Sequence, residues 1–109
     1  MKKFTYVVGN IEVAHRLPDG FGVKAMHGHS YQIKATFDTE GATSCFLLKE
    51  RLDAVLSVYD HTILNDTLGD DPTMENLAEV VLKRLKNEMC VSVEVFRPTI
   101  GFGAIACTV

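Results

Sequence analysis

The sequence predicts an α+β fold in which an antiparallel four-stranded sheet has two helices on one face, in the order ββααββ. Apolar and polar residues alternate near both ends of the chain, which is typical of half-buried strands, whereas apolar residues in the middle recur at helical spacing. No repeat, low-complexity run or linker interrupts the 109 residues. We therefore expect residues 1–109 to form a single domain.

The first half of the chain supplies two predicted strands, separated by a loop that contains Gly20 and Gly22. Within the first strand, Phe4–Leu17, the alternation changes phase at Gly9–Asn10, which predicts a bulge, a turn or a bend at that point. The second strand, His29–Phe37, alternates without interruption. Its apolar side chains share one face: Tyr31, Ile33, Ala35 and Phe37.

The middle of the chain is predicted to be helical. The first helix spans Cys45–Val58 and has an apolar stripe along one side. The second begins after Pro72, where Thr73 is a suitable N-cap and Glu75 places negative charge in the first turn. Two strands complete the fold, one over the alternating residues 91–95 and one over residues 103–109.

Composition favours an ordinary globular protein. The formal net charge of −3 provides no basic surface for nucleic acid, and the N-terminus contains neither a signal-peptide core nor a membrane span. The cysteines Cys45, Cys90 and Cys107 have largely apolar neighbours, so we interpret them as buried free thiols in a reducing cytoplasm. The sheet would keep one face and its edges open, which predicts a homo-oligomer.

Three histidines are candidate metal ligands. His27 and His29 flank Gly28, and residues two apart in a strand point to the same side. If the first two strands pair as a hairpin, His15 lies opposite them. Three imidazoles suit Zn²⁺ and leave a fourth position open, as in catalytic zinc sites. The alternative is a solvated or hydrogen-bonded histidine pair without a metal.

A carboxylate and an imidazole are adjacent at Asp60–His61, between the two predicted helices. A carboxylate can fix the tautomer of a neighbouring imidazole and raise its basicity, as a proton-transfer group requires. The alternative is a helix-terminal pair that makes only local hydrogen bonds.

Four stretches in this order resemble the 6-pyruvoyl-tetrahydropterin synthase and 6-carboxytetrahydropterin synthase family. They are VAHRLP at 13–18, HGHSY at 27–31, DHTILN at 60–65 and PTMENLA at 72–78. The resemblance spans nearly the whole chain. It implies the T-fold, in which strands from several subunits build a barrel with the helices outside, and a hexamer made of two trimers with active sites at subunit interfaces.

The resemblance also implies roles for individual residues. His15, His27 and His29 would bind zinc, and Asp60 with His61 would transfer protons. The implied substrate is 7,8-dihydroneopterin triphosphate, from which triphosphate is eliminated while the side chain is rearranged or cleaved. Zinc would polarise side-chain oxygens and so ease removal of adjacent protons.

The chain departs from the family at the position of the catalytic base. The family's base cysteine lies four residues before the first histidine of HGH, and here that position is Val23, which cannot transfer a proton. The neighbouring Lys24 could act as a base only if burial lowered its pKa strongly. We expect it to be an exposed loop residue, and none of the three cysteines offers an obvious replacement.

The chain also lacks the glutamate with which the family anchors the pterin ring. Phe96 or Arg97 stands at that place, depending on register, and Glu94 is out of phase with the neighbouring valines. In the pocket, Arg97 would favour a carboxylate or phosphate and so an altered substrate. On the surface it would have no role, and we favour this second interpretation. The candidate substrate contacts are Arg97, Phe96 and Thr73.

Two function hypotheses follow. The first is a zinc-dependent lyase that acts on a pterin triphosphate or a relative of it, and the retained histidines and Asp60–His61 favour it. The second is a non-catalytic zinc-binding T-fold protein that binds a pterin-like or other ligand, and the missing cysteine and glutamate favour that. A three-histidine metal oxygenase is less consistent with the sequence, because no metal-binding carboxylate is evident.

Overall fold

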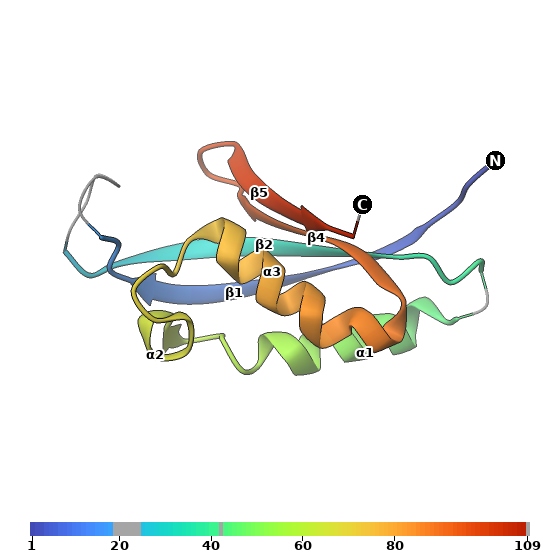
Figure 1. Ribbon diagram of the computed structural model, residues 1–109, viewed down its shortest axis with the longest axis horizontal. Helices are drawn as coiled ribbons and strands as arrows, with labels where there is room; N and C mark the ends of the chain where they lie inside the picture. The colour runs from blue at the N-terminus through green and yellow to red at the C-terminus, as the bar shows by residue number, and fades with distance from the viewer. Residues whose placement is uncertain (19–24, 42, 109) are drawn as a thin grey trace.

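The fold is a five-stranded sheet with two long helices on one face, seen in a computed structural model that describes residues 1–18, 25–41 and 43–108 (Figure 1). The strands are β1 (Thr5–His15), β2 (His27–Phe37), β3 (Thr62–Ile63), β4 (Cys90–Arg97) and β5 (Phe102–Cys107). The helices are α1 (Cys45–Leu56), α2 (Asn65–Leu68), α3 (Met74–Leu85) and the 3₁₀ turn η1 (Lys86–Glu88). The predicted α+β class with helices on one face is confirmed.

The sheet differs from the prediction by one strand. Its order is β3-β1-β2-β4-β5, and β3 runs parallel to β1, so the sheet is mixed rather than purely antiparallel. The strand β3 and the short helix α2 were not predicted. Two and four residues respectively are too short to show a hydrophobic period, so no pattern in the sequence marks them.

Strands β1 and β2 form a long hairpin without a bulge. Their register is unbroken from Thr5 opposite Phe37 to His15 opposite His27, so the interruption predicted at Gly9–Asn10 is wrong. The change of phase has another cause. Gly9 lies where α1 crosses β1, and a Cβ atom there would approach Leu56 Cδ1 to 2.6 Å. Glycine therefore lets the helix pack closely on a regular strand.

The two faces of the sheet have different surroundings. The face that packs against α1 and α3, called the covered face, holds the core, including Ile11, Ile33 and Val93. The opposite face, called the open face, exposes several large apolar side chains, among them Phe4, Tyr6, Phe96 and Ile105. Alternation along the strands assigns the residues to the two faces.

Both long helices begin at serine or threonine caps. Ser44 Oγ accepts a hydrogen bond from Phe46 N at the start of α1, and the Thr73 side chain accepts one from Asn76 N, as predicted for α3. Helix α1 ends at Leu56, two residues before the predicted end. Its buried leucines pack on β1, whereas α3 packs on β4 and β5.

The cysteines only partly follow their interpretation as buried thiols. The register of β2 and β4 shifts next to Phe37, so that Cys90 pairs with it and is buried, while Val91 is half-buried. Cys45 and Cys107 are exposed, which corrects the prediction for both. Cys45 starts a helix, and Cys107 alternates onto the open face. Within the described ranges, no helix is long and apolar enough to cross a membrane.

Replacing Gly103 by alanine is expected to destabilise the protein by about 1–3 kcal/mol, the usual cost of overpacking. A Cβ atom at this position of β5 would meet the backbone oxygen of Val95 and lie 2.9 Å from Phe96 Cα, and neither atom can move without parting β4 and β5. Urea unfolding should show a lower midpoint with an unchanged slope. Equal stability of G103A and the parent would contradict this packing of the two strands.

Candidate metal centre

Three imidazoles meet where the β1–β2 hairpin extends beyond the core. His15 and His27 are directly opposite in the register, and His29 lies two residues along β2, so all three side chains point to the covered face. Their candidate ligand atoms lie within 4.8 Å of one another. The ring centroids of His15 and His27 are 4.7 Å apart, with the rings edge to face. The structure therefore brings together the three histidines predicted from the sequence.

Backbone carbonyl groups orient two of these rings. His15 Nδ1 lies 2.9 Å from the carbonyl oxygen of Pro72, just before α3, and His27 Nδ1 lies 2.8 Å from that of Ala25. A carbonyl oxygen only accepts hydrogen bonds, so each Nδ1 must carry the proton. Each Nε2 then presents a lone pair. This fixed tautomer is the usual support of a metal-binding histidine.

The spacing of the two Nε2 atoms fits a cation between them. They are 3.1 Å apart, at which distance two facing lone pairs repel unless a proton or a metal ion lies between them. In tetrahedral zinc sites with bonds of about 2.05 Å, ligand nitrogens are about 3.3 Å apart. His29 Nδ1 is buried without a hydrogen-bond partner among the described residues. The donor set therefore fits zinc.

The surroundings of His15 and His29 favour their neutral forms. Burial lowers the pKa of His15, and burial followed by the positive charge of Arg97 lowers the pKa of His29 to about 4. Only neutral imidazoles bind metals, so at neutral pH no proton has to leave these two rings first.

Acidification is expected to destabilise the metal-free protein between pH 6.5 and about 4. The lowered pKa of His29 means that in this window the unfolded chain binds a proton that the folded chain excludes. The free energy of unfolding should therefore be retained above pH 6.5 and fall as the pH falls toward 4. Urea titrations in the presence of a chelator measure it. His29→Gln should show a shallower dependence, and an equal one would contradict the assignment.

A cavity of about 480 Å³ opens beside the three imidazoles. Thr73, Met74 and Glu75 line it from the start of α3, and Arg97 and Phe102 line it from the ends of β4 and β5. Thr73 thus lies at the cavity, but its side chain caps α3. The favoured surface position of Arg97 is wrong, because the register of β4 turns this side chain to the covered face. Phe96 alternates onto the open face, away from the imidazoles.

Burial raises the pKa of Tyr31 to about 12, so its phenol stays protonated beside the cavity. Its ring stacks on that of His29, with centroids 5.6 Å apart. Tyr31, Glu75 and Phe102 were not identified as site residues from the sequence. Glu75 comes three residues after Pro72, so the sequence places it in the first turn of the helix. Only the fold shows which cavity that turn faces.

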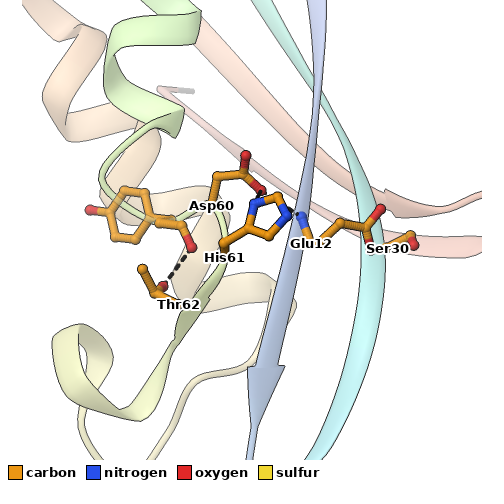
Figure 2. A network of polar contacts seen from close by, with 6 residues as sticks. Glu12, Ser30, Asp60, His61 and Thr62 are labelled. Carbon is orange, nitrogen blue, oxygen red and sulfur yellow. Dashed lines mark hydrogen bonds and ion pairs between the residues drawn. The ribbon is translucent and has the colours of Figure 1, made fainter.

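Asp60 and His61 form a second polar group, which lies beside β1 and directly precedes the edge strand β3 (Figure 2). Asp60 Oδ1 accepts a hydrogen bond of 2.8 Å from Glu12 N and lies 3.0 Å from His61 Nδ1, while His61 N donates to Glu12 O. The hydrogen bond from the Glu12 N–H is the largest cause of the lowered pKa of Asp60, and the hydrogen bond from His61 adds to it. The carboxylate therefore stays ionised. His61 has a φ of 58°, unusual for a non-glycine residue, and these hydrogen bonds hold it there.

The Asp60–His61 pair faces a different cavity. This cavity, of about 510 Å³, is lined by residues of β1 and β2 and by His61–Ile63. Among the described residues, it shares only His29 with the cavity beside the imidazoles. The side chain of His61 is 77 % exposed. On the open face beside it, Ser30 Oγ donates a hydrogen bond of 2.6 Å to Glu12 Oε2, and neither residue was identified from the sequence (Figure 2).

Two further sequence interpretations concern the missing base and anchor. Glu94 faces the open face, as its alternation predicts, and its carboxylate lies 3.6 Å from Lys34 Nζ, so it does not reach the imidazoles. Val23 and Lys24 lie outside the described residues, and the interpretation of both remains a prediction.

Known proteins of one family share this fold. The *Caenorhabditis elegans* 6-pyruvoyl tetrahydropterin synthase structure matches with a TM-score of 0.77 at 20% identity, covering 98% of this chain and 96% of that one. The *Plasmodium falciparum* 6-pyruvoyl tetrahydropterin synthase matches with a TM-score of 0.65 at 16% identity, covering 96% and 98%. The *Plasmodium vivax* enzyme matches with a TM-score of 0.61 at 14% identity, covering 97% and 99%.

These matches establish the T-fold, and the sequence itself carries the relationship further. No curated protein sequence matches significantly. The sequence model of the family described as 6-pyruvoyl tetrahydropterin synthase, however, matches residues 5–104. Since that match takes in every strand but the end of the last, this chain belongs to the 6-pyruvoyl tetrahydropterin synthase family.

Proposed function

We propose that the protein is a zinc-dependent lyase that eliminates triphosphate from 7,8-dihydroneopterin triphosphate, or a related pterin, and rearranges or cleaves its side chain. The observation that carries the proposal is the presence of two groups that such chemistry needs in one chain. One is the cluster of His15, His27 and His29, and the other is the Asp60–His61 pair. Membership of the family supports the substrate class.

His15, His27 and His29 would hold the zinc ion, leaving a position open toward the cavity beside Thr73 and Arg97. A zinc ion bound there supplies Lewis-acid polarisation of substrate oxygens. The carbonyl groups of Pro72 and Ala25 hold two of the rings in the tautomer that binds a metal.

His61 is the proposed proton-transfer group. Its Nδ1–H donates to ionised Asp60, so Nε2 is free to accept a proton from the substrate and later to return it. The carboxylate stabilises the imidazolium formed when the proton arrives. The hydrogen bonds from β1 hold both residues, so the pair is oriented before substrate binds.

We propose that a homo-oligomer, a hexamer of two trimers, brings these two groups together. Within one chain they line different cavities, so one subunit would supply the imidazoles and its neighbour His61. The exposed aromatic residues of the open face, together with the unpaired edges of the sheet, provide apolar surface and backbone groups for such an assembly. The same soluble assembly would act in the cytoplasm, without nucleic acid or membrane.

A second candidate function is a zinc-binding T-fold protein that binds a pterin-like ligand without turning it over. Val23 at the position of the family's base cysteine favours it, because a valine cannot transfer a proton. Glu94, the nearest acid on β4, is paired with Lys34 on the open face.

Incubating the zinc-loaded protein with 7,8-dihydroneopterin triphosphate separates the two. Mass spectrometry should show loss of substrate and formation of a new pterin, and the mass of the product identifies the reaction. His61→Ala, purified in the same way, controls for contaminating enzyme and should be inactive. Bound zinc without turnover in the parent protein would favour the non-catalytic function.

A further inference from the structure

We propose that Arg97 binds an oxyanion of the ligand, a carboxylate or a phosphate, in the cavity beside the three imidazoles. The inference rests on the proposed function only in taking this cavity as the ligand site. It adds the class of chemical group that the ligand must carry.

The fold turns Arg97 toward the cavity. Arg97 is the last residue of β4. It lies two residues after Val95 and four after Val93, both buried, so its side chain leaves the sheet on the same, covered face. Beyond the core, that face is occupied by the imidazoles and the start of α3. The guanidinium carbon lies 5.6 Å from the ring centroid of Phe102, its partner on β5. An arginine held over an aromatic ring loses little freedom when it binds an anion.

The positive charge of Arg97 is available for a ligand. Ion pairs among the described residues involve other cations, namely Lys2, Lys34, Lys49, Arg51 and Lys83. Because a guanidinium has five N–H donors and no acceptor, its partner must be an acceptor. Two parallel N–H groups match the two oxygens of a carboxylate or phosphate.

The rest of the cavity also favours an anion. The one carboxylate among the described lining residues is Glu75. A divalent metal and Arg97 together outweigh the negative charge of Glu75, so the metal-loaded cavity would be cationic. The start of α3 adds the positive end of a helix dipole.

Titration calorimetry of the zinc-loaded protein tests the proposal, with glycolate as the carboxylate probe and inorganic phosphate in a separate titration. The parent should bind one of the two at one site per chain. Arg97→Ala should weaken that binding by about ten- to a hundredfold, the usual effect of removing a charged hydrogen-bond partner. Arg97→Lys should be intermediate, because an ammonium keeps the charge but lacks the fork. The probe with the larger loss identifies the oxyanion.

Two further variants separate Arg97 from general charge. Arg51→Ala removes a surface arginine whose partner is Glu88, and it should bind the probes as the parent does. Glu75→Gln removes the negative charge of the cavity and should tighten binding. Equal affinity of R97A and the parent would show that the metal alone holds the anion and overturn the proposal. So would failure of both probes to bind, even if the pterin triphosphate is turned over.

Discussion

Zinc content is expected to fall from about one ion per chain to a small fraction when His27 is replaced by alanine. His27 Nε2 lies 3.1 Å from His15 Nε2, so this replacement removes one side of the site and leaves two ligands. Changing an outer partner of a metal ligand already costs about ten- to a hundredfold in affinity, and losing a ligand should cost more. Metal analysis after gel filtration in dilute zinc measures the loss, and turnover should disappear with the metal.

His61→Ala is the matched control for this experiment. It also removes one imidazole, but this imidazole is exposed and lies outside the cavity beside the three histidines. This variant should keep its zinc and its thermal stability while losing turnover. If H27A retained zinc with the affinity of the parent, the three histidines would not be the metal site.

The cluster of three histidines could be predicted from the sequence because it depends on the two-residue period of a β-strand. Side chains two apart in a strand share a face, which places His27 with His29, and a hairpin centred on the loop places His15 opposite them. Both conditions are local, and the observed register satisfies them. The cap at Thr73 was predictable for the same reason, because a cap depends on neighbours within one helical turn.

The surroundings of Arg97 could not be predicted, because they depend on long-range pairing. Simple alternation places its side chain on the same face as Val93 and Val95. The pairing of β4 with β5 and the packing of α3, however, bring Phe102 and Glu75 to the same cavity. The sequence alone left Phe96 and Arg97 as equal alternatives.

The surroundings of Asp60–His61 were hidden for a related reason. They depend on β3, whose two residues pair with a strand almost fifty positions away, at Val13 and Ala14. The adjacency of the two residues in the sequence indicated a proton-transfer pair. It did not indicate that the backbone of Glu12 holds both of them, or that they face a cavity different from that of the imidazoles.

Mixing two inactive variants is expected to restore turnover. His29→Ala lacks a proposed metal ligand but keeps Asp60–His61, whereas His61→Ala keeps all three metal-binding histidines but lacks the proton-transfer group. If each active site combines the metal cluster of one subunit with His61 of another, a mixed oligomer contains some sites in which both contributors are intact. Such sites should have the rate of the parent, since nothing in them is altered.

The experiment requires exchange of subunits, by co-expression with two affinity tags or by unfolding and refolding of the mixture with zinc. Each variant alone, treated in the same way, should remain inactive, and so should a mixture of His61→Ala with the double variant. Loss of His61 as a proton-transfer group typically costs about a hundred- to ten-thousandfold in rate, so a small fraction of restored sites is measurable. An inactive mixed oligomer that binds zinc would show that each subunit uses its own His61. The two cavities of one chain would then have to come together during the reaction.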